Sequence, residues 1–239
     1  SRGLGDVYKR QVLRDKNHPS IVLWSLGNES GAGANHAAMH GWIREYDKTR
    51  YVQYESGNPK SNISDVICPM YPTMSWLEDV MADDSDLRPF IMCEYAYAKS
   101  NSNGNFREFW DYVNKYPRFQ GGFIWDYIDQ SIWKKDRYGR WFQAYGGDFG
   151  ERPTDYNFSG NGIAYGGDRA PSPKMQEVKF CYQNIAVSID NSGFEVWNKN
   201  LFTSTDAFDC VALLYRDGKL YQQQELPNLS LIHISEPTR

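Results

Sequence analysis

The sequence predicts an α/β protein: the C-terminal part of a (β/α)8 TIM barrel, with about five strands, followed by the start of an all-β sandwich. Three observations predict this order. Short apolar runs alternate with helical patterns up to about residue 183. Polar and charged residues follow directly after these runs. Beyond residue 184, strand patterns follow one another without helices between them.

Five apolar runs rich in β-branched and aromatic residues predict the strands of the barrel. Continuous runs of this kind are typical of parallel strands that are buried on both faces. Most of the spacings between the runs leave room for a crossover helix, as a βαβ unit requires. The predicted strands are residues 21–26, 51–54, 66–70, 90–95 and 123–128.

Helical periodicity occupies the gaps between several of these strands. Residues 34–46 place Met39, Trp42 and Ile43 on one face, which predicts an amphipathic helix. A second helix is predicted over 75–82, where Ser75 and Glu78 form a capping box. The third predicted helix covers 106–116.

The polar residues after the strands favour a barrel over a doubly wound sheet. Barrel enzymes build their active sites at the carboxyl ends of the strands, and no Gly-rich nucleotide-binding loop follows any strand here. Five strands do not close a barrel, so three further strands are expected before residue 12. The residues concerned are Asn28, Glu29, Glu55, Tyr71, Glu94, Trp125 and Asp126.

The pattern changes after a Gly-rich loop at 145–168 and a short helix predicted near 174–182. Strands without helices between them are then predicted, and Asp217-Gly218 is the signal of a two-residue hairpin turn. These strands are residues 185–189, 194–198 and 210–215. The expected domains are 12–183 (partial barrel) and 184–228 (partial sandwich), flanked by a non-native leader at 1–11 and a non-native tail at 229–239.

The composition excludes several classes of partner. Lys and Arg number 26 against 30 Asp and Glu, so the net charge is −4 and no basic cluster is available for nucleic acid. No run of about 18 apolar residues exists, so no membrane span is predicted. The 4 cysteines lack CxxC spacing, which argues against a zinc knuckle. Aromatic residues make up 15%, which is typical of a large aromatic core and also suits sugar rings as ligands.

Two glutamates, Glu29 and Glu94, each end an apolar strand. Brought together across a barrel mouth, two carboxyl groups in unlike surroundings perform acid and nucleophile chemistry on a glycosidic bond. A separation of about 5 to 5.5 Å gives a retaining enzyme, and a wider one gives an inverting enzyme. The structural alternative is that each Glu caps a helix or pairs with an Arg.

Five motifs in order carry a resemblance to a known family. They are RDKNHPS at 14–20, WSLGNES at 24–30, CEYA at 93–96, GGFIWD at 121–126 and YGGDFG at 145–150. Together they resemble the large bacterial β-galactosidase type of glycoside hydrolase family 2. The resemblance covers about residues 12–183 and extends less specifically into the sandwich strands.

The resemblance implies roles for five residues at the strand ends. Glu29 would be the general acid and then the base, and Glu94 the nucleophile. Asn28 would hydrogen-bond the sugar 2-hydroxyl, a contact that strengthens towards the transition state. Tyr71 would stand near the nucleophile and tune its charge. Trp125 would form the floor of the galactose subsite, where C–H faces pack on the indole.

The same resemblance implies two cations. A Mg²⁺ would use Glu29, and a Na⁺ in contact with the sugar would use the backbone oxygen of Phe158 and the side chain of Asn161. Oxygen ligands suit both hard cations. The remaining ligands of both sites are expected in segments before this chain.

One position departs from the family pattern. Tyr97 stands where the best-known members carry a His that contacts the galactose hydroxyls. The Tyr either alters the sugar preference or replaces one hydrogen-bond donor by another.

The leading interpretation is therefore a retaining β-galactosidase that acts on terminal non-reducing β-galactosides such as lactose, homo-oligomeric when complete. A β-glucuronidase or β-mannosidase of the same family keeps the mechanism and changes the sugar. A carbohydrate-binding protein without turnover is the alternative from another class, but it has no need for two charges around one bond.

Overall fold

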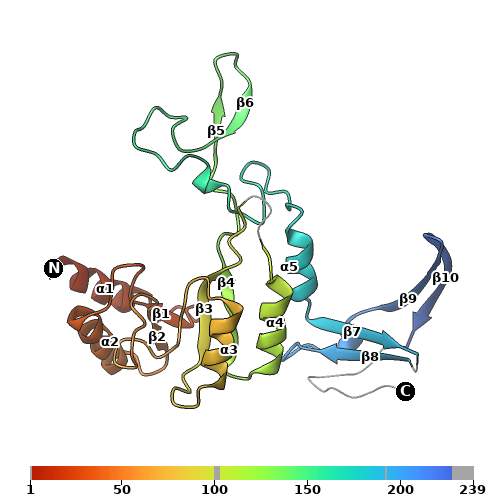
Figure 1. The fold of residues 1–239 in the computed structure, drawn as a ribbon, viewed down its shortest axis with the longest axis horizontal. Helices are drawn as coiled ribbons and strands as arrows, with labels where there is room; N and C mark the ends of the chain where they lie inside the picture. The colour runs from red at the N-terminus through yellow and green to blue at the C-terminus, as the bar shows by residue number, and fades with distance from the viewer. Residues whose placement is uncertain (1, 100–102, 192, 228–239) are drawn as a thin grey trace. The chain divides into compact units, whose positions relative to one another are not determined.

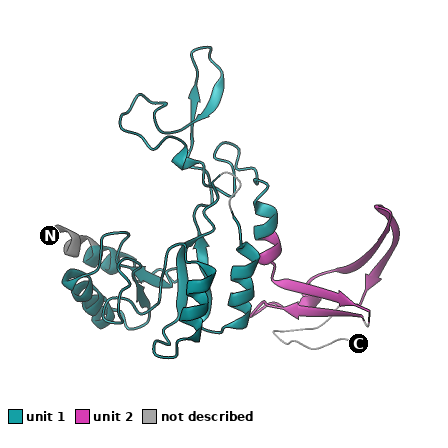
Figure 2. Ribbon diagram, viewed as in Figure 1, with its two compact units in different colours: residues 1–178 teal, residues 179–239 magenta. Residues whose placement is uncertain are grey.

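The computed structural model describes residues 2–99, 103–191 and 193–227 (Figure 1). The chain divides into two compact units, residues 1–178 and 179–239 (Figure 2). The division falls inside a helix, slightly before the boundary expected at 183. The segment 229–239, expected as a non-native tail, lies outside the described residues.

The N-terminal part of the first unit contains the first two parallel strands. Leu23 pairs with Tyr51 in register, and the two strands are shorter than the apolar runs that predict them. The helix between them has the predicted bounds, whereas the first helix begins inside the stretch expected as a leader. The elements are α1 (Arg2–Asp15), β1 (Leu23–Ser25), α2 (Ala34–Tyr46) and β2 (Tyr51–Gln53).

A hydrophobic core forms between these elements. The face of α2 predicted from the sequence packs against it, with Ile43 buried and Met39 and Trp42 partly buried. Side chains along and just after the two short strands contribute most of the rest, together with Val12 of α1 and Ile63 of a loop. The buried members are Val12, Trp24, Leu26, Ile43, Val52, Tyr54 and Ile63.

The predicted strand at 66–70 forms only two isolated bridges, from Ile67 to Phe90 and from Met70 to Glu94. Both bridges are parallel, so the segment still occupies the place of a barrel strand. It leads to α3 (Met74–Ala82), whose N-cap is Thr73, since the Thr73 side chain accepts a hydrogen bond from the Trp76 backbone N–H. The capping box predicted at Ser75 and Glu78 is therefore wrong.

The next parallel pair is β3 (Phe90–Tyr95) with β4 (Phe119–Ile124), connected through α4 (Phe106–Lys115). β3 has the predicted bounds, but the prediction of 123–128 for the following strand is wrong. Gly121 and Gly122 disguise its start because glycine is depleted in strands. Their small size is needed here, since a Cβ at Gly122 would lie 2.9 Å from the Met92 Cβ.

Past β4, the structure contains a hairpin that the sequence did not predict. β5 (Ile132–Lys135) pairs antiparallel with β6 (Trp141–Ala144). The predicted Gly-rich loop then contains one short 3-10 helix, η1 (Tyr156–Ser159). The short helix expected near 174–182 is α5 (Met175–Cys181).

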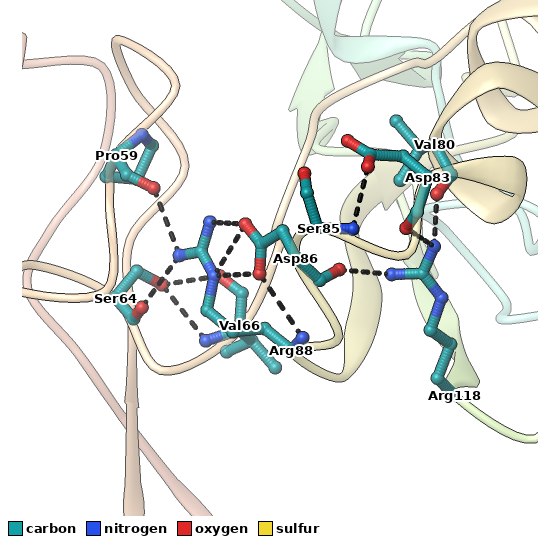
Figure 3. A network of polar contacts seen from close by, with 9 residues as sticks. All are labelled: Pro59, Ser64, Val66, Val80, Asp83, Ser85, Asp86, Arg88 and Arg118. Atoms are coloured by element: carbon teal, nitrogen blue, oxygen red, sulfur yellow. Dashed lines mark hydrogen bonds and ion pairs between the residues drawn. The ribbon is translucent and has the colours of Figure 1, made fainter.

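At the amino ends of β3 and β4, two arginines tie together loops that are distant in sequence (Figure 3). Arg88 forms an ion pair with Asp86 at 2.6 Å and donates to the Pro59 and Ser64 carbonyls at 3.1 and 2.9 Å. Its hydrogen bonds lower the pKa of the Asp86 carboxyl. Arg118 donates to the backbone carbonyls of Asp86, Asp83 and Val80. Every charge drawn in this network has a partner.

In the described residues, all the strands of the second unit pair antiparallel. Asp217 and Gly218 both have positive φ, 50° and 75°, as the predicted two-residue hairpin turn requires. Its strands form two hairpins, β7 with β8 and β9 with β10. The elements are β7 (Ile185–Asp190), β8 (Gly193–Asn198), η2 (Thr205–Ala207), β9 (Cys210–Arg216) and β10 (Lys219–Leu226).

The predicted fold class is confirmed: parallel strands with crossover helices, as in part of a TIM barrel, precede an all-β segment. None of the described helices is both long enough and apolar enough to cross a membrane.

Candidate active site

Glu29 lies in a turn just after β1, and its backbone adopts the left-handed conformation with φ of 50°. Such a conformation costs a residue other than glycine about 1–3 kcal/mol and persists only where the surroundings enforce it. The Glu29 side chain is exposed.

The residues at the end of β2 enforce this turn. The Leu26 N–H donates to the Gln53 carbonyl at 3.1 Å, which continues the parallel ladder past β1. The Glu29 N–H donates to Glu55 Oε1 at 2.5 Å, and the Ser30 N–H donates to the Tyr54 hydroxyl at 3.0 Å. The conformation of the turn therefore depends on residues 53–55.

Tyr54 is fully buried and was not identified from the sequence as a site residue. Its hydroxyl also donates to the Gly31 carbonyl at 2.6 Å, and its ring stacks on His36 with centroids 4.3 Å apart. The signal available in the sequence is its place between the strand-end residues Gln53 and Glu55.

Glu94 lies within β3, one residue before its end, and is half-buried. Two hydrogen bonds connect it to Tyr71: the Tyr71 N–H donates to the Glu94 carbonyl at 2.9 Å, and the Tyr71 hydroxyl donates to Glu94 Oε2 at 2.7 Å. The structure thus places the predicted nucleophile and the tyrosine predicted to tune it in direct contact.

The pKa of Glu94 is raised above its ordinary value, first because burial penalises the charged form. The hydrogen bond from Tyr71 acts in the opposite direction. The negative charges of Glu29, Glu55 and Asp126 add to the rise.

Glu29, Glu55, Glu94 and Asp126 therefore lie near enough to interact, at the carboxyl ends of the strands. Within the described part of the chain, none of the four forms an ion pair with Lys, Arg or His. The Tyr71 hydroxyl lies in the same region. Burial and the hydrogen bond to Glu94 raise the pKa of Tyr71. Tyr71 therefore stays protonated and can donate. Two of the four, Glu55 and Asp126, have no role implied by the family resemblance.

Trp125 follows β4 directly, and its backbone N–H donates to the Tyr95 carbonyl at 3.1 Å. Asn161 is fully buried beside it. The Asn161 amide, oriented to satisfy both of its ends, accepts from the Trp125 indole N–H at 3.0 Å and donates to the Ser159 carbonyl at 3.2 Å. The two predicted substrate-binding residues are therefore connected, and Asn161 orients the indole.

Tyr97 lies between Tyr71, the hydrogen-bond partner of Glu94, and Phe158. Its ring meets the Tyr71 ring edge-on, with centroids 5.9 Å apart. The rings of Tyr97 and Phe158 of η1 are tilted relative to each other, with centroids also 5.9 Å apart. Phe158 itself is exposed. A chain of ring contacts thus runs from Tyr71, which binds Glu94, through Tyr97 to Phe158.

Asn28 is exposed and lines a cavity of about 670 Å³ together with Ser30, His36 and Met39. The structure describes no contact from its side chain to Glu94 or to Trp125. Among the described residues, no hydrogen bond holds the side chain of Asn28 or the carboxylate of Glu29.

Cation binding has a limited set of donors here. Among the described residues, no group of three or more His, Cys, Asp or Glu side chains could hold a metal ion. Glu29 presents an exposed carboxylate, which is the donor chemistry that Mg²⁺ prefers. The Asn161 oxygen retains one lone pair beyond its bond to Trp125, which fits a single contact to a hard cation.

Comparison with known proteins gives the same assignment along most of the chain. The model of the glycosyl hydrolases family 2, TIM barrel domain, matches residues 2–187. A β-galactosidase of Halalkalibacterium halodurans is 49% identical over 216 residues, which cover 89% of this chain and 21% of the relative. The chain therefore spans about a fifth of that curated relative.

Two solved structures share the fold at low identity. An FMN-binding β-glucuronidase from Facaelibacterium prausnitzii L2-6 matches with a TM-score of 0.53 and 16% identity, over 94% of this chain and 39% of that one. A putative β-galactosidase from Bacteroides fragilis matches with a TM-score of 0.53 and 13% identity, over 96% of this chain and 40% of that one.

Proposed function

Because the chain belongs to glycosyl hydrolase family 2, through its TIM barrel domain, we propose that it carries both catalytic carboxylates of a retaining β-galactosidase. Glu94 is the nucleophile and Glu29 the acid/base. The observation that carries this proposal is the Tyr71 hydroxyl bonded to Glu94 at 2.7 Å, in a region where three further carboxylates gather without a cation.

In the first step, the ionised Glu94 carboxylate attacks the anomeric carbon of the sugar. As the C–O bond to the leaving group breaks, protonated Glu29 gives its proton to the leaving oxygen. A covalent galactosyl ester on Glu94 results, and Glu29 is now ionised. Tyr71 withdraws negative charge from the Glu94 oxygen by its hydrogen bond, which keeps the nucleophile ionised and oriented.

In the second step, ionised Glu29 removes a proton from a water molecule that attacks the anomeric carbon. The ester bond breaks and Glu94 leaves as a carboxylate, so both groups return to their starting states. The burial and like charges that raise the proton affinity of Glu94 also make it a stronger nucleophile than an exposed carboxylate.

The sugar is held by the residues around Glu94. Trp125, oriented by Asn161, offers an indole face to the apolar side of galactose. Asn28 takes the 2-hydroxyl, and Tyr97 stands where the family pattern has a residue that contacts the galactose hydroxyls. The freedom of Asn28 fits a contact that forms only with substrate bound.

We also propose two cations, which the family resemblance implies and whose donor chemistry these residues fit. Glu29 would hold Mg²⁺, which stabilises the negative charge of the acid/base when bound. The Phe158 carbonyl and Asn161 would hold Na⁺ beside the sugar. Removal of divalent cations by a chelator is expected to lower kcat for substrates with poor leaving groups more than for activated ones.

The substrate is a terminal β-galactoside such as lactose, and the complete protein is a homo-oligomer. The β-galactosidase name of a relative 49% identical supports galactose. A structural neighbour with the name β-glucuronidase favours a glucuronide as the second candidate sugar, at only 16% identity.

The test uses the full-length protein that contains this segment. It is incubated with 2-deoxy-2-fluoro-β-galactosyl fluoride, which forms the ester quickly and loses it slowly, and the labelled peptide is located by mass spectrometry. A galactosyl adduct on Glu94 is the expected result. An adduct formed only by the glucuronyl or mannosyl analogue would change the sugar, and no adduct with any of them would favour a binding protein.

A further inference from the structure

We propose that Glu55 is a positioning residue for catalysis: its carboxylate holds the backbone of Glu29 in the left-handed turn that presents the acid/base. This inference rests on the proposed function, since it concerns how Glu29 is presented to the leaving group. Glu55 follows β2 and has no role in the reaction steps described above.

The contact is direct and specific. The Glu29 N–H donates to Glu55 Oε1 at 2.5 Å, so the partner of this backbone group is a charged side chain and not a carbonyl of the next strand. The two residues are 26 positions apart in sequence. Hydrogen bonds to ionised acceptors are shorter and stronger than neutral ones.

The bond falls where the ladder between β1 and β2 has already ended. The backbone pairing reaches Leu26 N–H with the Gln53 carbonyl, and the chain then leaves the strand direction. Glu29 has φ of 50°, a conformation that its side chain disfavours. Without an acceptor at this point, nothing in the described residues would bind the Glu29 N–H.

Glu55 is itself held in place. The Ser56 hydroxyl donates to the same Oε1 at 2.7 Å, and Glu55 is half-buried. Next to it, Tyr54 binds the Ser30 N–H at 3.0 Å. The carboxylate of Glu55 is therefore a fixed point, and the direction of the Glu29 side chain follows from the backbone conformation that it stabilises.

The experiment compares three variants of the full-length protein: Glu55→Ala, Glu55→Gln and, as a matched control, Glu78→Gln. Glu78 also accepts a hydrogen bond, from the Tyr112 hydroxyl at 2.6 Å, but lies on α3 away from the turn. Each variant is assayed with two substrates. Methyl β-galactoside has a poor leaving group, and 2,4-dinitrophenyl β-galactoside has a leaving group that needs no protonation.

Glu55→Ala is expected to lower kcat/KM for the methyl galactoside about 100-fold and for the dinitrophenyl galactoside less than about 3-fold. Glu55→Gln keeps an acceptor oxygen and is expected to recover most of the loss. Azide is expected to raise kcat of Glu55→Ala with the dinitrophenyl galactoside. This small anion replaces water in the second step and attacks the anomeric carbon without the help of a base. Glu78→Gln is expected to match the wild type in all assays.

A structural readout accompanies the kinetics. Hydrogen exchange of the peptide that covers residues 26–31 is expected to accelerate in Glu55→Ala and to stay unchanged in Glu78→Gln. If Glu55→Ala does not fold, Glu55→Asp withdraws the carboxylate by one methylene and is expected to give the same leaving-group-dependent loss.

Equal losses with both substrates, or no loss, would overturn the role of Glu55. Failure of the proposed function gives a different result, since the wild-type protein would then hydrolyse neither galactoside and form no adduct on Glu94.

Discussion

The amino ends of β3 and β4 and the carboxyl ends of the parallel strands β1 to β4 differ in how their charged side chains are paired. At the amino ends of β3 and β4, Arg88 is paired with Asp86, and Arg118 binds three backbone carbonyls. At the carboxyl ends, Glu29, Glu55, Glu94 and Asp126 gather, and none has a cation partner among the described residues.

A charged group whose hydrogen bonds are satisfied avoids the penalty of an unpaired charge, whereas gathered like charges destabilise a fold by self-repulsion. A raised pKa at Glu94 means that ionising this group costs folding free energy at neutral pH, a penalty relieved as pH falls and the group is protonated. The amino ends are thus arranged for stability, and the carboxyl ends retain a cost that the reaction uses. Substitutions at the carboxyl ends are therefore expected to change mainly the kinetic constants. Substitutions at the amino ends are expected to change mainly the free energy of unfolding.

The largest effect is expected from Glu94→Gln at the carboxyl end. The amide cannot form the ester, so kcat should fall by at least about 10⁴-fold while sugar binding persists. Steady-state kinetics and equilibrium binding of galactose measure the two quantities. The unfolding temperature should rise slightly, because a half-buried charge is removed. Turnover at the wild-type rate would exclude Glu94 as the nucleophile.

Glu29→Gln is expected to lower kcat/KM for poor leaving groups by about 10²–10⁴-fold and for dinitrophenyl galactoside only slightly. The reason is that only the poor leaving group needs a proton in the transition state. A plot of log(kcat/KM) against the leaving-group pKa should become steeper in the variant. A parallel drop along the whole series would show that Glu29 is not the acid.

Tyr71→Phe tests the one bond that favours the ionised form of Glu94. Its loss should lower kcat about 10-fold and raise the pKa of Glu94 further, so the acid limb of the kcat/KM profile should move to higher pH. Tyr127→Phe, at an exposed tyrosine without a contact to Glu94 among the described residues, is the matched control. A shift of the acid limb to lower pH would contradict the assignment.

The smallest kinetic effect is expected at the amino ends. Arg118→Met removes the donor to the carbonyls of Val80, Asp83 and Asp86 and should lower the free energy of unfolding by about 1–3 kcal/mol. The kinetic constants of the folded protein should stay within about 2-fold of the wild type. Denaturant unfolding and kinetics on the same preparation check both; Lys115→Met, an exposed cation nearby, is the control. A large kinetic loss would break the contrast between the two ends.

The elements predicted with correct bounds are those with an uninterrupted pattern. α2 at 34–46 and β3 at 90–95 agree with the prediction because their apolar spacing is set by residues within the element. β4 begins earlier than predicted because Gly121 and Gly122 lower its strand signal while its packing against Met92 requires them. The β5–β6 hairpin was missed because its five-residue connection lacks the short turn signal that marked Asp217-Gly218.

The residues of the candidate site also divide into those that a local sequence pattern predicts and those that it does not. Glu29 and Glu94 were predicted because each follows or ends an apolar strand, which is a local pattern. Tyr54 was missed because its function is a contact of its hydroxyl with the Ser30 backbone, 24 positions away. No pattern within either segment records that contact.

The sequence by itself determined which residues lie at the carboxyl ends of the strands, because apolar runs and the polar residues that end them are written in neighbouring positions. Only the tertiary structure decided which of these residues meet. The bonds from Tyr71 to Glu94 and from the Glu29 N–H to Glu55 join positions 23 and 26 apart. Both depend on the register of neighbouring parallel segments and on a left-handed turn, which arise from packing of the whole unit and not from the local pattern.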